Sequence, residues 1–189
     1  MIIFFGPAGS GKSLQGQILA KKYGWEWLSV GQLLRDQNDP KVDEDLKSGE
    51  LFDDDLVTKL MHDAISKTEA AHKNAILDGY PRNVWQAKWL IGQGDITKIT
   101  GAIIIDVSAK ELWQRIASRG RSDDAEAVIK RRWEIFEQNI YSILPLLEEE
   151  NVKITTINGV GSVEEITNRI EAVLQTWGLI DPPKTTPNN

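Results

Sequence analysis

The residues best suited to chemistry are eight consecutive positions near the start of the chain, Gly6 to Ser13, which read GPAGSGKS. They match the pattern of a phosphate-binding loop (P-loop) at every required position. Its glycines let the backbone curl until several N–H groups converge on one anion, and the helix behind the loop adds the positive end of its dipole. Lys12 supplies a full charge for the β- and γ-phosphates of a nucleoside triphosphate, and Ser13 offers a hydroxyl to magnesium. The loop alone leaves GTPases, motors, transporter ATPases and small-molecule kinases open.

An aspartate further along the chain also suits phosphate chemistry. Asp78 comes directly after the apolar run Ala75–Leu77, which indicates a buried strand that ends at this carboxylate. Ligands of open α/β sheets bind at the carboxyl ends of the strands. We therefore expect Asp78 beside the P-loop, where it can order the water around magnesium.

Five short segments are the predicted strands that must position these residues. They are Ile2–Phe5, Trp25–Ser29, Ala75–Asp78, Gly101–Val107 and Val152–Ile157. Helical patterns lie between and after them, at about Lys12–Tyr23, Gln32–Arg35, Asp43–Lys47, Asp53–Thr68, Val84–Ile91, Ser108–Ser118, Asp124–Glu149 and Ser162–Trp177. We expect a helix end at Pro40 and a bend or interruption near Pro145. Strands that alternate with helices predict an α/β protein of the P-loop NTPase fold, with a five-stranded parallel sheet flanked by helices.

Composition excludes several classes of protein. A chain of 189 residues with 41% apolar and 26% charged residues fits one soluble globular domain. The net charge of −6 argues against binding to nucleic acid or to an acidic membrane, because both favour a basic face. The sequence has no cysteine, which excludes disulfides and cysteine-ligated zinc, and it shows neither a secretory signal nor a run of ~20 apolar residues. We expect a cytoplasmic protein without zinc, nucleic-acid partners or membrane attachment.

Four further segments follow the P-loop in order. They are LSVGQLLR at 28–35, GELFDDDLV at 49–57, DGYPR at 78–82 followed by Gln86 and Ala87, and an arginine-rich stretch from Arg115 to Arg132. With these segments, the chain from Met1 to about Leu174 resembles the adenylate kinases of the short-lid type and their nucleoside monophosphate kinase relatives. The resemblance implies a monomeric enzyme that transfers a phosphoryl group directly, with magnesium, in the reaction ATP + AMP ⇌ 2 ADP.

The resemblance also implies a set of donor-side and catalytic residues. ATP would be bound by Gly9, Ser10, Gly11, Lys12, Ser13, Leu14, Arg115, Arg119 and Gly161. The catalytic residues would be Lys12, Arg82, Arg119, Arg121 and Arg132. Arg115 would stack on the donor adenine, and the backbone of Gly161 would accept its amino group. Arginines suit phosphoryl transfer because a guanidinium stays charged and grips phosphate oxygens with two parallel hydrogen bonds.

On the acceptor side, the resemblance implies that AMP is bound by Val30, Arg35, Phe52, Val57, Gly79, Arg82, Gln86, Arg121 and Arg132. Arg35 and Arg82 would hold its α-phosphate. Gln86 lies one helical turn past Arg82, where its amide can both donate to and accept from adenine, and this favours AMP as acceptor. Magnesium would be held by Ser13 and, through water, by Asp78.

The resemblance divides the chain into one kinase domain, residues 1–178, and a tail. The core would comprise residues 1–29, 74–118 and 125–178, with an insertion for the monophosphate at 30–60 and a very short lid at 119–124. Asp123 and Asp124 would clamp the lid arginines on closure. We expect the proline-rich tail, residues 179–189, to be disordered.

Three positions depart from the family pattern. Leu14 stands in place of a threonine that binds phosphate, Val30 in place of a threonine of the acceptor site, and Gln32 in place of an aspartate that helps hold magnesium waters. Val30 and Asn83 leave a UMP/CMP kinase open as an alternative. Leu14 and Gln32 leave open a catalytically weak or silent nucleotide-binding module. The DGYPR segment with Gln86 disfavours a kinase of the shikimate or gluconate type.

Overall fold

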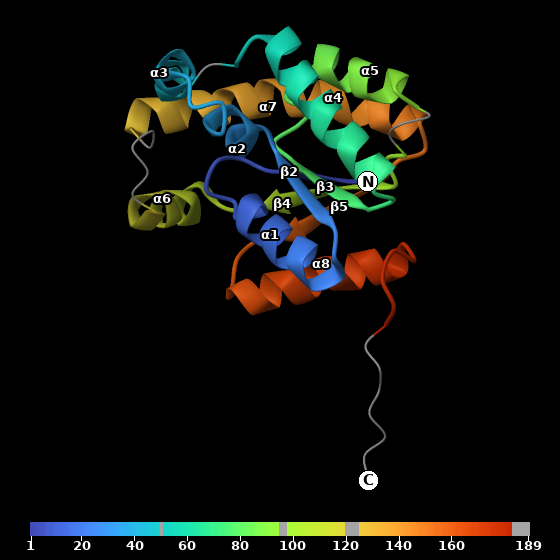
Figure 1. Cartoon of the computed structure of the whole chain (residues 1–189). Coiled ribbons are helices and arrows are strands. Elements are labelled where there is room, and N and C mark those ends of the chain that lie inside the picture. The colour runs from blue at the N-terminus through green and yellow to red at the C-terminus, as the bar shows by residue number, and fades with distance from the viewer. Residues whose placement is uncertain (50, 95–97, 120–124, 183–189) are drawn as a thin grey trace.

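The computed structural model describes residues 1–49, 51–94, 98–119 and 125–182, with the backbone alone for Asp43 and Arg119. Its centre is a five-stranded parallel sheet in the order β2-β3-β1-β4-β5 (Figure 1). The strands are β1 (Ile2–Phe5), β2 (Glu26–Ser29), β3 (Ala75–Asp78), β4 (Gly101–Asp106) and β5 (Lys153–Asn158). The predicted fold class and strands are confirmed to within about two residues at the ends.

Helices cover both faces of this sheet, as expected for parallel strands. They are α1 (Lys12–Tyr23), α2 (Val30–Arg35), α3 (Pro40–Ser48), α4 (Asp54–Ala70), α5 (Val84–Gly92), α6 (Ala109–Arg119), α7 (Glu126–Glu149) and α8 (Val163–Thr176). In Figure 1, α4, α5 and α7 lie on one side of the sheet, and α1 and α8 lie on the other. Within the described residues, no helix is both long enough and apolar enough to cross a membrane.

The central strand β1 divides the core into two clusters. Ile3 and Phe5 point into a cluster with α4, α5 and α7, whereas Ile2 and Phe4 point into the one beneath α1, α6 and α8. All four side chains are at most 4% exposed. Successive strand residues face opposite sides of a sheet, so an unbroken apolar run is the pattern that a strand covered on both sides requires.

The parallel register brings the carboxyl ends of the strands together at one edge of the sheet. Phe4 of β1 is in register with Asp78 of β3, and Asp78 is in register with Ser29 of β2. The loops after β1, β2 and β3 therefore leave the sheet at the same place. This arrangement confirms the predicted position of Asp78 beside the strand that carries the P-loop.

Two helix boundaries differ from the sequence prediction, both at prolines. Pro40 begins α3 at its first position instead of ending a helix there, because Asp39 caps the helix by accepting from the Lys41 N–H at 2.8 Å. The helix α7 continues through Pro145, so the predicted interruption does not occur. Pro145 has no N–H to donate to the carbonyl four residues earlier, which belongs to Tyr141. Tyr141 is 79% exposed, so water can bond to this carbonyl instead.

The last helix matches its predicted start. Ser162 and Glu165 form a reciprocal capping box in which each side chain accepts from the other's backbone N–H. Beyond the helix, Leu179 donates its N–H to the Leu174 carbonyl, and Leu179 and Ile180 pack against the core. The chain is therefore packed on the domain at least as far as Ile180, and the remainder of the predicted tail from residue 183 lies outside the described residues.

Candidate active site

The P-loop leaves β1 and turns into α1 at the predicted place. Gly9 and Gly11 have φ values of +90° and +93°, a left-handed backbone conformation that strains any residue with a side chain. A Cβ on Gly9 would also lie only 3.0 Å from Cγ1 of Ile116 in α6. Both glycines are therefore required by the shape of the loop, and Gly11 forms the N-cap of α1.

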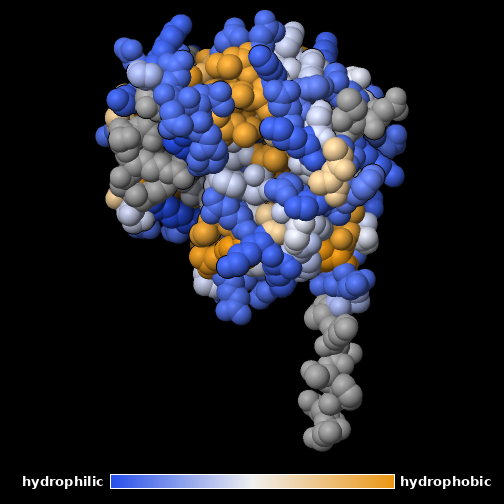
Figure 2. Space-filling model, viewed as in Figure 1, coloured by the Kyte–Doolittle hydropathy of each residue, from blue (hydrophilic) through white to orange (hydrophobic). Residues whose placement is uncertain are grey.

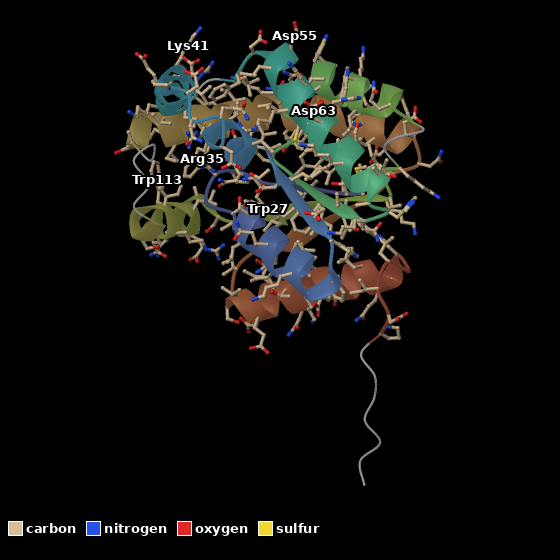
Figure 3. All side chains as sticks on the ribbon, in the orientation of Figure 1. Trp27, Arg35, Lys41, Asp55, Asp63 and Trp113 are labelled. Atoms are coloured by element: carbon tan, nitrogen blue, oxygen red, sulfur yellow. The ribbon has the colours of Figure 1, made fainter. Side chains whose placement is uncertain are left out.

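A cavity lies beside this loop and receives side chains from five parts of the chain. Its lining includes the sequence-predicted residues Lys12, Ser13, Arg35, Phe52, Asp78, Gly79, Arg82 and Arg132. The P-loop and the end of β3 form one wall, the segment from α2 to Phe52 forms a second, and α7 forms a third. Figure 3 labels Arg35 at the end of α2, on the second of these walls. Residues separated by more than a hundred positions thus share one site.

Ser13 and Asp78 meet at the wall formed by the P-loop and β3. The Ser13 hydroxyl donates to Oδ2 of Asp78 at 2.6 Å. The Ser13 hydroxyl and the Asp78 carboxylate are oxygen ligands that suit magnesium. This ion completes its octahedron with water and substrate phosphates. In the described part of the chain, no group of three or more His, Cys, Asp or Glu side chains could hold a metal ion. A magnesium ion here would therefore depend on a bound nucleotide for further ligands.

Three guanidiniums converge on the cavity. Burial lowers the pKa of Arg82 most strongly, Asp78 opposes this change, and the charges of Arg132 and Arg35 lower the pKa further. The side chains of Arg35, Arg82 and Arg132 all line this cavity, although they come from α2, the loop before α5, and α7. Gathering like charges costs free energy, and a polyanion in the cavity removes that cost.

Arg82 is held by its own backbone surroundings. Its Nε donates to the Gly79 carbonyl at 2.8 Å, and its backbone N–H donates to Oε1 of Gln86 at 2.8 Å. Gly79 has φ of +74°, and a Cβ at this position would lie 3.0 Å from Nη2 of Arg82. The glycine therefore serves both the turn and the close approach of the guanidinium.

Gln86 is in a different situation from the one that the sequence predicts. It is 1% exposed, and it is not part of the cavity lining. Its Nε2 donates to Oδ1 of Asp54 at 2.7 Å, while its Oε1 accepts from Arg82. Asn83 joins the same network, because it caps α5 by accepting from the Gln86 N–H and donates to both oxygens of Asp54. The amide of Gln86 thus has protein partners at both ends.

Two other predicted acceptor residues lie next to the cavity rather than in it. Val30 and Val57 are each 3% exposed and belong to the core cluster beneath α4. Figure 2 shows apolar surface between the α3 and α4 regions of Figure 1. Leu46, Phe52 and Leu56 are partly buried and pack against the same core cluster. Of these, Leu46 and Phe52 also line the cavity.

The predicted donor-base residues lie on the other side of the P-loop. Arg115 of α6 donates to the Ser10 carbonyl through Nη1 at 3.3 Å and to the Gly159 carbonyl through Nη2 at 2.8 Å. It thereby joins the P-loop to the loop that contains Gly161. Leu14 is 47% exposed at the start of α1, and the neighbouring Gln15 donates to the Val163 carbonyl. The structure thus brings Arg115 and the loop of Gly161 to one side of the P-loop, and it leaves Leu14 exposed at the start of α1.

Several predicted residues cannot be placed at the site. Arg121, Asp123 and Asp124 lie outside the described residues, as does the side chain of Arg119. Arg132, at the other flank of the expected lid, donates through Nη2 to the Leu46 carbonyl at the end of α3, at 2.8 Å. It therefore connects α7 to the segment expected to bind the monophosphate.

Sequence reasoning missed one wall of the cavity. Ile135, Phe136, Asn139, Ile140 and Ile143 of α7 line it below Arg132. Their spacing of three or four residues, which begins at Arg132, is the signal that could have placed this face of the helix against the site. Asp54 was also missed, since an aspartate in the first turn of a helix suggests only a favourable dipole interaction.

A P-loop, an adjacent serine and aspartate, and three converging arginines in one cavity define a P-loop phosphotransferase. The family model described as adenylate kinase matches residues 4–152. Among similar curated proteins, adenylate kinase 1 of Nostoc sp. is 36% identical over 92% of this chain and 97% of its own length. The adenylate kinases of Mycobacterium ulcerans and Thermus thermophilus are 35% and 32% identical, over 89% and 92% of this chain and 95% and 96% of their own lengths. The chain belongs to the adenylate kinase family.

Proposed function

We propose that this protein catalyses ATP + AMP ⇌ 2 ADP as an adenylate kinase. The observation that carries this function is the convergence of Arg35, Arg82 and Arg132 on the cavity that Lys12 also lines. A P-loop that only hydrolyses ATP has no need for a second group of cations opposite it. Membership of the adenylate kinase family supports the same reaction.

On the donor side, the P-loop amides and Lys12 hold the β- and γ-phosphates of ATP. Lys12 Nζ now donates to the Pro7 carbonyl at 3.2 Å, so it lies over the loop where these phosphates bind. Arg115, with Leu14 and the loop of Gly161, forms the side of the P-loop that receives the donor base. The side chain of Arg119 completes our proposed donor set, and Arg121 would contact the acceptor and the group in transfer; both side chains lie outside the described part of the chain.

On the acceptor side, Arg35 and Arg82 hold the α-phosphate of AMP. An oxygen of this phosphate attacks the γ-phosphorus of ATP, and the bond from that phosphorus to the β–γ bridging oxygen breaks. Charge spreads over the equatorial oxygens of the group in transfer, and Arg132 stabilises it together with Lys12 and Arg82. No covalent intermediate and no general base of the protein are needed.

Magnesium enters this proposal as a partner of ATP. The Ser13 hydroxyl and Asp78 would hold it, Asp78 through water, and the ion would neutralise charge on the phosphates. Gln32 does not share this task, because its Nε2 donates to Asp36 in the next turn at 2.7 Å. We therefore propose that Asp78 is the one side chain, among those described, that orders the water molecules bound to magnesium.

The domain organisation follows from the same roles. We propose a single kinase domain, residues 1–178, in which the insertion 30–60 closes over AMP and the lid 119–124 closes over the phosphates. Closure excludes water from the transfer step. The contact between Arg132 and the Leu46 carbonyl supports this proposal, because it already joins the insertion to the helix that follows the lid.

The acceptor base remains the choice to be tested. Asn83, which in the sequence favoured a pyrimidine kinase, is committed to capping α5 and to Asp54, so it gives that alternative no support. Initial rates of diphosphate formation with ATP, magnesium and each of AMP, UMP, CMP and GMP test the proposal. We expect AMP to be the best acceptor by at least about tenfold, the effect of roughly one well-placed hydrogen bond. A higher rate with UMP or CMP than with AMP would show that a pyrimidine nucleotide is the preferred acceptor. No product with any of the four monophosphates would indicate a silent nucleotide-binding module.

We further propose that the enzyme acts as a monomer in the cytoplasm. One chain supplies all the residues of the proposed site, and a sequence without cysteine suits a reducing compartment. Light scattering during gel filtration tests the first statement, and fractionation of the source cells tests the second.

A further inference from the structure

A tryptophan that follows Arg132 is hydrogen-bonded to the backbone of the P-loop. The indole N–H of Trp133, in α7, donates to the Ala8 carbonyl at 2.9 Å. The rest of the ring packs against the core cluster beneath α6 and α8. Trp133 therefore reaches the loop from outside the cavity, and it is not among the residues that line it.

This bond fixes the direction of the following peptide N–H. The Ala8–Gly9 peptide is trans, and in a planar trans peptide the carbonyl and the next N–H point in opposite directions. Holding the Ala8 carbonyl toward Trp133 thus turns the Gly9 N–H away from it. Within the described residues, the Gly9 N–H has no hydrogen-bond acceptor. It is available to an anion.

The same device recurs along the loop. The Ser10 carbonyl accepts from Arg115, which turns the Gly11 N–H the other way, and the Pro7 carbonyl accepts from the Ser10 N–H at 3.1 Å. The carbonyls of Pro7, Ala8 and Ser10 are thus held by donors, and α6 and α7 provide the side-chain donors to Ser10 and Ala8. An anion site made of backbone amides requires this arrangement, because a single peptide that turned over would point a carbonyl at the phosphate.

A second tryptophan holds Trp133 in position. The rings of Trp113 and Trp133 are 4.8 Å apart between centroids, with 60° between their planes. Trp113 belongs to α6, and Figure 3 shows it on the side of that helix that faces the start of α7. The aromatic pair therefore joins α6 to α7, the two helices between which the proposed lid runs.

We propose that Trp133 is a positioning residue for the donor nucleotide, because its indole N–H orients the Ala8–Gly9 peptide so that the Gly9 N–H faces the ATP phosphates. The inference rests on the proposed binding of ATP by the P-loop, and it adds a residue that lies outside the cavity lining. It concerns the donor alone, because we propose that Arg35 and Arg82, and not the P-loop amides, hold the acceptor.

Two variants test this role. Trp133→Phe removes the N–H and keeps an aromatic ring, while Trp113→Phe alters the same aromatic pair and leaves the bond to Ala8 intact. Calorimetry without AMP gives the Kd for ATP, steady-state rates give KM for ATP and for AMP separately, and ¹⁵N spectra follow the Gly9 amide. We expect Trp133→Phe to raise the Kd and KM for ATP about three- to tenfold, the effect of one hydrogen bond, with KM for AMP unchanged. We expect its Gly9 resonance to move, and Trp113→Phe to behave like the parent protein.

The outcomes separate this inference from the proposed function. An unchanged Kd for ATP in Trp133→Phe overturns the positioning role, and so does an equal rise in both KM values, which would indicate general loosening. If Trp133→Phe is too unstable for kinetics, the position of the Gly9 resonance at low temperature still decides the matter. A parent protein that binds ATP without forming ADP would refute the kinase reaction while leaving the test of Trp133 intact.

Discussion

Gln86 donates its side-chain N–H to Oδ1 of Asp54 at 2.7 Å, and this bond fixes which end of its amide is the donor. A carboxylate can only accept, and the Arg82 N–H on the other side can only donate. The amide therefore cannot turn over without losing both bonds. One N–H and one lone pair of Gln86 are not used in these two bonds, and their order is fixed. Because Gln86 does not line the cavity in this structure, our proposal that it recognises the AMP base requires these groups to become accessible when AMP binds.

Asp54 should accordingly influence the choice between purines. Adenine offers an amino donor and a ring acceptor, whereas hypoxanthine offers the reverse pattern, which a turned amide would match. In Asp54→Asn the constraint from the carboxylate is removed, because an asparagine can donate or accept, and only the Arg82 N–H still favours the original orientation. The amide can then turn at the cost of one bond instead of two. We expect the ratio of kcat/KM for AMP over IMP to fall about two- to fivefold, within the range for one altered hydrogen bond.

Asp55→Asn is the matched control for this prediction. Asp55 lies in the same helical turn and is exposed, and Figure 3 shows it at the outer end of α4, so its removal changes the helix-end charge equally. An AMP preference that falls as much in Asp55→Asn as in Asp54→Asn would assign the effect to charge and not to the amide of Gln86.

Lys12→Ala should abolish phosphoryl transfer while the protein stays folded. The side chain lies over the P-loop and is not part of the buried core, so its loss removes charge from the phosphates and little packing. We expect kcat to fall at least about 10²- to 10³-fold, as when a preorganised donor to a transition state is removed. ADP formation and the circular dichroism melt are measured in parallel with Lys21→Ala, an exposed lysine of the same helix. Equal rates in Lys12→Ala and the parent would remove the P-loop from the mechanism.

Asp78→Asn should change the magnesium dependence of the reaction. The carboxylate that accepts from Ser13 becomes neutral, and its hold on magnesium-bound water weakens. We expect the magnesium concentration for half-maximal rate to rise at least about tenfold, in line with the effect of losing an outer-shell ligand. Asp106→Asn, at the end of β4 on the other side of β1, is the control. A parallel shift in the two variants would point to a general electrostatic effect.

Tyr80 should make the fold sensitive to high pH. It is fully buried, and burial raises its pKa to about 12, with the Thr58 hydroxyl opposing this only in part. The unfolded chain loses this proton near pH 10, so the stabilisation is complete below that pH and is lost as the pH rises to about 12. The free energy of unfolding should fall by about 2–3 kcal/mol across this window because of Tyr80 alone.

Tyr80→Phe separates this contribution from the titration of lysines. Its hydroxyl has no hydrogen-bond partner among the described residues by distance and angle, so its removal should cost little at pH 7. Urea unfolding of the parent and the variant at pH 7, 10 and 11.5 measures the difference. Parallel pH profiles in the two proteins would contradict the assignment to Tyr80.

Local motifs made much of the site predictable from the sequence. The P-loop, Asp78 and Arg82 each follow an apolar run, and parallel strands bring such loops to one edge of the sheet. The partnership of Gln86 with Asp54 was not predictable, because it depends on where the start of α4 lies relative to α5. Trp133 was hidden for another reason: an aromatic residue on a helix suggests packing, and its N–H becomes informative only once Ala8 is known to lie within reach.

The bond from Arg132 to the Leu46 carbonyl has a consequence for the speed of the catalytic cycle. If Arg132 holds the transferred group as we propose, the N–H that now donates to Leu46 has to change acceptor to reach a phosphate, so its net gain is smaller than that of a contact with a fully hydrated side chain. When ADP departs, the Leu46 carbonyl is close enough to accept again from the Arg132 guanidinium in place of the phosphate. We expect this alternative partner to shorten the residence time of the product, whose release limits turnover in many enzymes that close over their substrates.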